Sequence, residues 1–188
     1  MNKKDQDAFL RERQSVIIEA AKHCFSKDGF HGSMANLVAQ SGFGAGQIYR
    51  YFSSKEALIT AVIQSVLGEW HMFLSERLTA KTKLCEIFDK TSAFWSGWET
   101  REQLLLLEIY SEASRNDSVR NILFQEEENL LSYLESRHDA WPVTAGETPV
   151  RLRIKLMLLI IDGFICRVVS ADEPDLDELS RIDNIIAQ

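Results

Sequence analysis

Prolines, cysteines and histidines are scarce in this sequence, and each scarcity excludes a class of protein. Only three prolines interrupt the 188 residues, so long helices are allowed over most of the chain. The three cysteines, Cys24, Cys85 and Cys166, are far apart and include no C-x-x-C pair, which argues against a disulfide framework or a zinc site. The four histidines are also scattered. We therefore expect no bound metal and a reducing, cytoplasmic setting.

The sequence also lacks the apolar segments of a membrane or secreted protein. Its most apolar run, residues 154–169, contains Lys155, Asp162 and Arg167 and is shorter than the roughly 20 residues that cross a bilayer. The amino-terminal segment is charged throughout and carries no apolar stretch of a signal peptide. We expect a soluble protein.

No common catalytic motif is present. The chain has no Walker loop, no G-x-S-x-G, no paired-histidine metal site and no cysteine–histidine pair close in sequence. Asp162 lies deep in the apolar run, but the glycine that follows it favours a helix distortion or a hydrogen-bonded packing contact. We predict that the protein is not an enzyme and needs no cofactor.

Charge is unevenly distributed along the chain. The net charge is -7, which by itself argues against a nucleic-acid partner. Residues 1–60, however, hold eight Lys and Arg against six Asp and Glu, whereas residues 61–188 hold thirteen against twenty-two. A mildly basic segment on an acidic body is compatible with a local DNA-binding surface.

Apolar periodicity predicts an all-α fold of about nine helices. Asp28-Gly29 ends the first helix, Ser33 is a candidate N-cap of the second, and Ser53 to Glu56 has the spacing of a capping box that begins the fourth, which ends near residue 79. A domain boundary falls within this fourth helix, so residues 1–60 form one domain and 61–188 the other. The remaining predicted helices are 10–27, 34–40, 45–52, 82–98, 101–114, 117–138, 150–170 and 175–187.

The stretch SGFGAGQIYRYFSSKEAL, residues 41–58, has the pattern of a helix-turn-helix: a short helix, a glycine turn and a second short helix. Gly42 allows the left-handed turn. Gly46 lies inside the second helix, where glycine costs about 1 kcal/mol relative to alanine. That cost is explained if another molecule approaches the backbone there, as a base pair does in a major groove.

The exposed residues of this segment have the chemistry of DNA contacts. Gln47 can pair bidentately with adenine, and Arg50 with guanine or a phosphate. Tyr49 and Tyr51 carry hydroxyl groups that can reach phosphates. Lys55, in the first turn of the fourth helix, is unfavourable for the helix dipole unless an anion such as a DNA phosphate binds there. The alternative for each residue is a simple turn or a solvated surface.

Residues 10–60 resemble the amino-terminal domain of the tetracycline-repressor (TetR) family, above all in GFHGSMANLVAQSGFGAGQIYRYFSSKEAL. Phe43-Gly44 departs from the usual Val-Ser, and Val38-Ala39 from Ile-Ala. The resemblance implies a DNA-binding regulator with an effector-binding and dimerisation domain after the helix-turn-helix. It further implies backbone contacts from Ser33, Tyr49, Tyr51 and Lys55, and base contacts from Ala45, Gly46, Gln47 and Arg50.

The segment IKLMLLIIDGFICRVV is apolar on nearly every side, so it must be buried on nearly every side. A four-helix bundle made from residues 150–170 and 175–187 of two chains satisfies this requirement, and a central core helix in a monomer is the alternative. The residues expected at the dimer interface are Leu156, Leu159, Ile160, Phe164, Val168, Ile182, Ile185 and Ile186.

A ligand site is predicted among the aromatic residues of the second domain. Glu108 and Glu112 lie one helical turn apart, and an inward-facing carboxylate there suits a lipophilic cation. The alternatives are an ordinary aromatic core and a salt bridge to Arg115. The residues expected at this site are Trp95, Trp98, Glu108, Tyr110, Glu112, Phe124 and Phe164.

Together these observations predict a homodimeric transcription regulator that acts as a repressor. A small lipophilic effector is expected to release it from a palindromic operator in double-stranded DNA. The alternatives are a regulator without a small-molecule ligand and a helical interaction module, which leaves the first 60 residues unexplained.

Overall fold

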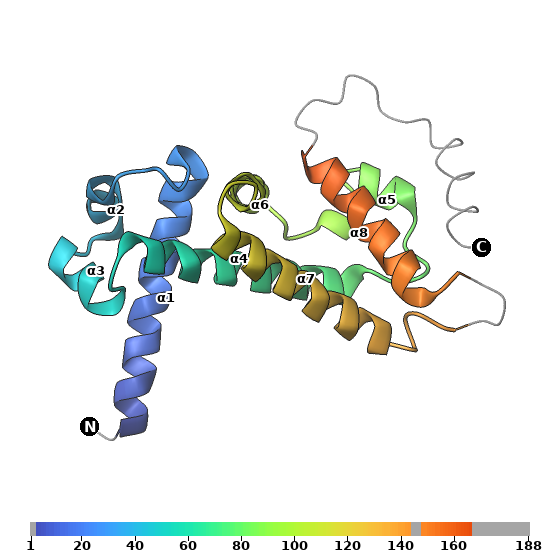
Figure 1. Cartoon of the computed structure of the whole chain (residues 1–188), viewed down its shortest axis with the longest axis horizontal. Coiled ribbons are helices and arrows are strands. Elements are labelled where there is room, and N and C mark those ends of the chain that lie inside the picture. Colours follow the sequence, from blue (N-terminus) through green and yellow to red (C-terminus); the bar gives the residue numbers. More distant parts are fainter. Residues whose placement is uncertain (1–2, 144–147, 167–188) are drawn as a thin grey trace. The chain divides into compact units, whose positions relative to one another are not determined.

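A computed structural model describes residues 3–143 and 148–166, and these residues form eight α-helices and one short 3-10 helix, with no strand among them (Figure 1). The predicted all-α class is confirmed. The described chain folds into two compact units. The first takes the residues up to Gly68 together with Thr100–Ile122, and the second takes Glu69–Glu99 with the described residues from Leu123 onward.

The first unit begins with α1, Lys3–Asp28, which is longer than the predicted helix 10–27. Its buried stripe contains Ile17, Ala21, Cys24 and Phe25, all at most 3% exposed. The helix ends at Gly29, whose φ of 67° lies in the left-handed region that glycine tolerates best. The predicted end of the first helix is therefore confirmed.

The next two helices form the predicted helix-turn-helix. In α2, Met34–Ser41, the Ser33 hydroxyl accepts the Asn36 backbone N–H at 3.2 Å and caps the first turn. Gly42 follows with a φ of 70° and turns the chain towards α3, Ala45–Tyr51. Because α2 packs against α3, Leu37 and Ile48 are each only 1% exposed.

The fourth helix, α4, covers Lys55–Arg77 and continues from the first unit into the second. The predicted capping box is wrong by one residue, because Ser54 rather than Ser53 caps the helix and its hydroxyl accepts the Ala57 backbone N–H at 3.1 Å. Length and composition alone would allow α4, among the described helices, to cross a membrane. Its residues Leu58, Val62 and Ile63 are fully buried, however, as in the core helix of a folded unit.

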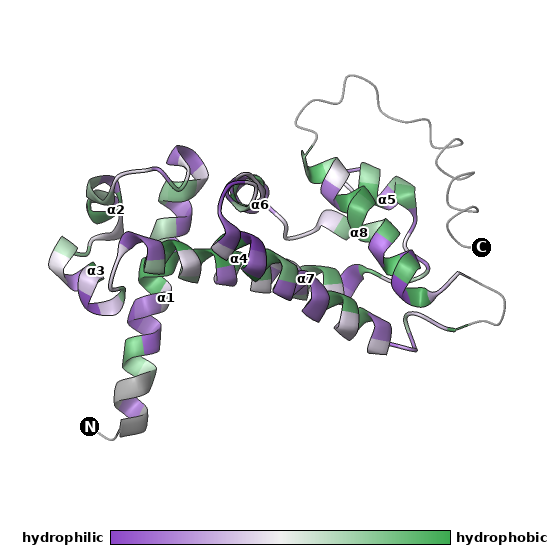
Figure 2. Ribbon diagram, viewed as in Figure 1, coloured by the Kyte–Doolittle hydropathy of each residue, from purple (hydrophilic) through white to green (hydrophobic). Residues whose placement is uncertain are grey.

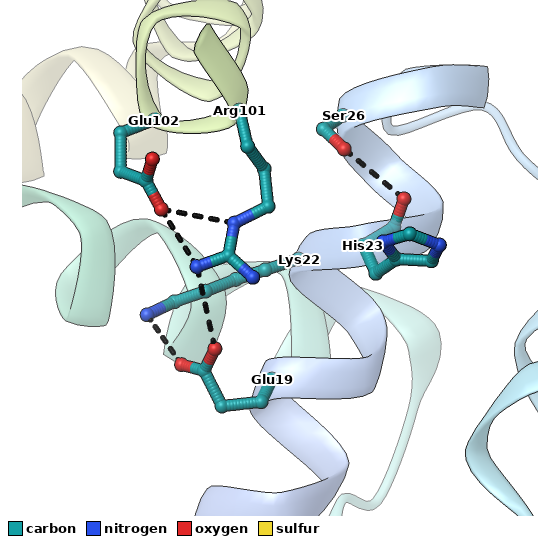
Figure 3. A network of polar contacts seen from close by, with 6 residues as sticks. All are labelled: Glu19, Lys22, His23, Ser26, Arg101 and Glu102. Carbon is teal, nitrogen blue, oxygen red and sulfur yellow. Dashed lines mark hydrogen bonds and ion pairs between the residues drawn. The ribbon is translucent and has the colours of Figure 1, made fainter. Parts of the chain in front are cut away.

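The first unit is completed by α6, Thr100–Ala113, which packs against α1 although more than 70 residues separate them. Leu105, Leu106 and Ile109 are fully buried there. A chain of charges also joins the two helices (Figure 3): Glu19 pairs with Lys22 at 2.7 Å and with Arg101 at 3.7 Å, and Arg101 pairs with Glu102 at 2.6 Å. The aliphatic stem and the amine of Lys22 are almost completely buried, so Glu19 supplies a counter-charge that this lysine requires.

In the second unit, the predicted helix 82–98 is wrong. The structure has α5, Leu84–Phe88, then a turn and the 3-10 helix η1, Ala93–Trp95. The Asp89 carboxylate accepts both the backbone N–H and the hydroxyl of Thr91, at 2.8 and 2.7 Å, and so offers the backbone an alternative to the helix. Gly97 then has a left-handed φ of 81°, which a continued helix does not allow.

The second unit also contains most of α7, Asp117–Ser136, and all of α8, Val150–Cys166. Figure 2 shows apolar residues along α8. One face of this helix is buried, including Ile154, Met157 and Ile161. The predicted extension of this helix to residue 170 and the predicted helix 175–187 lie outside the described residues.

The left-handed turn at Gly42 gives a first prediction. We expect Gly42→Ala to lower the free energy of unfolding by about 1–2 kcal/mol, because a side chain disfavours a positive φ. No atom lies within 4 Å of the added Cβ, so conformational strain is the whole effect. Urea unfolding of the full chain measures it.

The matched control is Gly68→Ala, inside α4, where the added Cβ also meets no atom within 4 Å. This variant should gain up to about 1 kcal/mol, because alanine is the better helix former. Equal effects of the two substitutions would contradict the role of the positive φ.

Candidate DNA-binding surface

Helix α3 presents one face to solvent because its other face is anchored in the first unit. Ile48 is 1% exposed, and Phe43 and Phe52, which flank the helix, are 8% and 7% exposed. With these residues buried, the 3.6-residue period turns the rest of α3 outward. The exposed residues are Ala45, Gly46, Gln47, Tyr49 and Arg50. Five of the six residues of this helix that are expected to face bases or phosphates are thus exposed, and the sixth, Tyr51, is half-buried.

The first turn of α3 carries very few side-chain atoms. Gly44 is the N-cap and has no side chain to accept a helix N–H, so half of a capping box is missing. The other half is present: the Gln47 side-chain oxygen Oε1 accepts the Gly44 backbone N–H at 3.3 Å. At Gly46 an added Cβ would meet no atom within 4 Å. The protein's own packing therefore does not require glycine at position 46.

The four residues expected to contact phosphates are differently placed. Tyr49 is 48% exposed, whereas Tyr51 and Lys55 are half-buried. Ser33 is exposed, and its hydroxyl oxygen accepts the Asn36 backbone N–H. The hydroxyl hydrogen of Ser33 can still be donated to a phosphate oxygen. All four side chains carry a hydrogen-bond donor, and none of the four is fully buried.

Sequence inspection missed the effect of Glu56, which follows Lys55 directly. Hydrogen bonds from its own backbone N–H and from the Ser54 hydroxyl hold the pKa of the Glu56 carboxyl below its usual value. The carboxylate is therefore ionised at neutral pH and partly offsets the positive charge of Lys55. The local field for a phosphate at the start of α4 is weaker than Lys55 alone suggests.

Glu108 holds the turn between α1 and α2. Its carboxylate oxygen Oε1 accepts the Phe30 backbone N–H at 2.9 Å, and it lies 3.1 Å from the position of a Cβ added to Gly29. Close by, the Asn36 side-chain amide donates to the Asp28 carboxylate at 3.1 Å. This turn leads directly into Ser33 and α2. Glu108, expected at the ligand site, is thus a structural partner of the helix-turn-helix.

Glu112 also has partners within the first unit. It pairs with Arg115 at 2.6 Å and accepts from the Asn116 side-chain amide at 2.9 Å. The amide of Asn116, followed by the guanidinium of Arg115, lowers the pKa of the Glu112 carboxyl. The alternative given for this residue, a salt bridge to Arg115, is therefore present. Its predicted contact with a ligand stays a prediction.

The aromatic residues expected at the ligand site lie in different parts of the chain. In the second unit, Trp98 lies against Trp70 and Phe73, with ring centroids 4.7 and 5.0 Å apart, and Trp95 lies 5.7 Å from Phe164. The Trp95 indole N–H donates to the Ile87 carbonyl at 2.8 Å. The Trp98 indole N–H is buried without an acceptor among the described residues. These rings form one cluster.

The other two predicted aromatic ligand contacts do not belong to this cluster as described. Phe124 is in the second unit but 63% exposed on α7. Tyr110 is in α6, which belongs to the first unit, together with Glu108 and Glu112. The structure thus brings Trp95, Trp98 and Phe164 together and leaves the rest of the predicted ligand set elsewhere.

Two of the residues expected at a dimer interface, Leu156 and Leu159, lie on the exposed side of α8. Leu156 is 40% exposed and Leu159 is 67% exposed, and Leu152, which was not predicted, is 48% exposed on the same side. Ile160 and Phe164 are half-buried. The other four predicted residues lie outside the described part of the chain: Val168, Ile182, Ile185 and Ile186.

Comparisons with known proteins agree with this geometry. Residues 17–62 match the profile of a family described as bacterial regulatory proteins, tetR family. The chain is 28% identical to the uncharacterized HTH-type transcriptional regulator YfiR of Bacillus subtilis, and the match covers 88% of this chain and 84% of that protein.

Two solved structures share the fold. GusR of Salmonella enterica has a TM-score of 0.68 and 22% sequence identity, with 92% of both chains covered. The multidrug binding protein EbrR complexed with ethidium has a TM-score of 0.60 and 18% identity, with 93% of this chain and 98% of that chain covered.

The bond between Glu108 and the α1–α2 turn gives a second prediction. We expect Glu108→Ala to lower the free energy of unfolding by about 1–3 kcal/mol, because the Phe30 N–H loses its acceptor. Glu108→Gln keeps an acceptor oxygen and should lose less. Urea unfolding and hydrogen exchange of the Phe30 amide measure the two effects.

Glu127→Ala, on the exposed side of α7, is the control and should change stability by less than about 0.5 kcal/mol. An unchanged exchange rate at Phe30 in Glu108→Ala would show that the bond does not hold the turn.

Proposed function

Because this chain belongs to the TetR family of bacterial transcriptional regulators, a family of DNA-binding proteins and not of enzymes, we propose that it is a repressor. Two copies bind a palindromic operator in the cytoplasm, each inserting α3 into a major groove. A small lipophilic molecule then releases the dimer from the DNA. The observation that carries the proposal is the exposed face of α3, fixed by the burial of Ile48 and bearing Gln47 and Arg50.

The small residues in the first turn of α3 would allow DNA to approach the helix backbone closely. Ala45 and Gly46 are exposed and have almost no side chain, and no atom of the described residues lies within 4 Å of a Cβ added to Gly46. Base edges can therefore come near the backbone of this turn. Tyr49, Tyr51, Ser33 and Lys55 then supply donors to the phosphates on either side, and binding should weaken steeply with salt.

The apolar side of α8 supports the dimer. Leu152, Leu156 and Leu159 are 40–67% exposed, although the opposite side of the same helix is buried within the subunit. Leucines on one exposed side of an otherwise buried helix favour a contact with a second copy of the chain. A dimer also matches the two-fold symmetry of a palindromic site.

Helix α4 is suited to connect binding of an effector with release of the DNA. It runs without a break from Lys55, a proposed phosphate contact, to Trp70 and Phe73 in the aromatic cluster. An effector that binds one orientation of α4 more tightly shifts the population towards it, with a coupling of typically about 1–3 kcal/mol. In the released state the two α3 helices no longer match the spacing of the half-sites.

The aromatic cluster favours a lipophilic effector with a planar ring. The buried Trp98 indole N–H, which has no acceptor among the described residues, is available to an oxygen or nitrogen of such a molecule. A complex of the structural neighbour EbrR with ethidium, a planar aromatic compound, is in keeping with this class. The positive charge first expected for the effector stays a prediction, and the two carboxylates on which it was based, Glu108 and Glu112, both have partners within the first unit.

Selection of bound DNA from a random pool at low salt, repeated with candidate ligands, tests the proposed function. A palindromic consensus that is lost when an aromatic ligand is added supports all of it. A consensus that no ligand affects leaves a regulator without a small-molecule effector. Failure to enrich any sequence would favour a helical interaction module instead.

The glycine inside α3 gives a third prediction. We expect Gly46→Ala to raise the free energy of unfolding by up to about 1 kcal/mol, because alanine is the better helix former and the added Cβ meets no protein atom. The same methyl group should weaken binding to the selected operator by about tenfold or more, about 1.4 kcal/mol, because it meets the DNA. Urea unfolding and fluorescence anisotropy measure the two effects.

Ser132→Ala, an exposed position of α7, is the control that stabilises a helix away from the proposed surface, and it should leave operator affinity unchanged. If Gly46→Ala binds the operator as tightly as the unaltered protein, the backbone of α3 does not approach the bases.

The exposed leucines of α8 give a fourth prediction. We expect Leu159→Glu to convert the dimer into a monomer at micromolar concentration, because a carboxylate at the centre of an apolar interface loses its water. Sedimentation velocity measures the change. Val143→Glu, at a position that is 76% exposed, is the matched control and should remain dimeric. Dimeric Leu159→Glu would place the interface elsewhere.

A further inference from the structure

Gln47 has a bond within the protein that conflicts with the base contact expected of its residue type. Its side-chain oxygen Oε1 accepts the Gly44 backbone N–H at 3.3 Å. The N-cap itself makes no side-chain hydrogen bond, so this is the side-chain bond that supports the first turn of α3. A seven-residue helix with glycine at its N-cap and at position 46 has little other support there.

A glutamine side chain has one oxygen acceptor and one NH2 group with two donor hydrogens. Bidentate recognition of adenine uses both at once: the oxygen accepts from N6 and the NH2 donates to N7. The Gly44 N–H occupies one of the two lone pairs of this oxygen and draws it towards the beginning of the helix. Bidentate recognition of adenine then requires the second lone pair to face the base edge together with the NH2 group, whereas donation by the NH2 group alone needs no such alignment. The exposed NH2 group of Gln47 remains free to donate.

We propose that Gln47 recognises DNA as a hydrogen-bond donor only and selects guanine, not the adenine that its residue type predicts. The inference rests on the proposed function, because it requires α3 to lie in a major groove. Guanine presents two adjacent acceptors there, N7 and O6, and either can accept a hydrogen of the NH2 group. Adenine places an amino donor next to its N7, and that donor faces the NH2 group without an acceptor.

The rest of the exposed face of α3 has the same donor character. Its sequence, AGQIYRY, contains no aspartate, glutamate or asparagine, so no other side-chain amide or carboxylate is available as an acceptor. Arg50, three residues after Gln47 and also exposed, carries donors only. A surface that offers donors at neighbouring positions complements the acceptor edge of guanine-containing base pairs.

Two variants separate the two roles of the Gln47 side chain. Gln47→Glu keeps an oxygen that can accept the Gly44 N–H and removes the donor hydrogens, whereas Gln47→Ala removes both. Helix content and thermal unfolding of both variants are measured first, and Gln47→Glu is expected to match the unaltered protein. DNA is then selected from a random pool with the full-length protein and with each variant.

The expected result is a guanine position in the consensus that both variants lose. At that position, 7-deazaguanine, which lacks the N7 acceptor, should weaken binding of the unaltered protein by about tenfold and binding of Gln47→Ala by less than about twofold. The double comparison assigns the guanine contact to Gln47 and not to Arg50.

An adenine at the position that depends on Gln47 would overturn the inference. In that case 2-aminopurine, which lacks the N6 amino group, should weaken binding as much as 7-deazaadenine does, and the proposed function would stand. A consensus that neither variant changes would also overturn it, because Gln47 would then contact no base. If the unaltered protein enriches no sequence at low salt, the proposed function itself fails.

Discussion

The burial of Ile48, with Phe43 and Phe52 on either side of α3, is the constraint on which the rest of the candidate DNA-binding surface depends. A helix of seven residues that includes a glycine does not form by itself in water. Tertiary packing therefore both stabilises α3 and fixes its rotation about its own axis. Once Ile48 points inward, the positions of Gln47 and Arg50 on the outer face follow from the helical period.

The same packing extends to a helix that is distant in sequence. Helix α6 contributes apolar side chains and the carboxylate of Glu108 to the unit that contains the helix-turn-helix. The buried Lys22 also depends on Glu19, which in turn contacts Arg101 of α6. The orientation of the α1–α2 turn is therefore set partly by residues beyond position 100, outside the segment that carries the family signature.

Much of the first unit could be predicted from the sequence because its signals are local. The turns at Gly29 and Gly42 require a positive φ, and Ser33 lies directly before an apolar stripe, so each signal depends on neighbouring residues. The end of α5 at Phe88 was not predicted. The hydrogen bonds from Thr91 to the Asp89 carboxylate compete there with the helical backbone bonds, and apolar periodicity does not reveal this competition. The N-cap at Ser54 was misplaced by one residue because two serines are adjacent.

The functions expected for individual carboxylates were the least predictable. Glu108 and its partner Phe30 are 78 residues apart, and no local pattern in the sequence indicates that they meet. Glu112 and Arg115 are three residues apart, so their salt bridge was foreseeable and was considered as the alternative. The contacts expected of α3 with DNA, and those of α8 with a second chain, involve partners that a single sequence does not contain, and they stay predictions.

The membership of α6 in the first unit has a consequence for synthesis of the protein. When the ribosome has released α1 to α4, the emerging polypeptide still lacks Leu105, Leu106 and Ile109, which are fully buried in the finished unit. The Phe30 backbone N–H likewise has no Glu108 carboxylate to donate to until residue 108 has been translated. An incomplete translation product that stops before α6 therefore contains residues 17–62, which match the family profile, without the apolar side chains of α6 that complete the core of this unit.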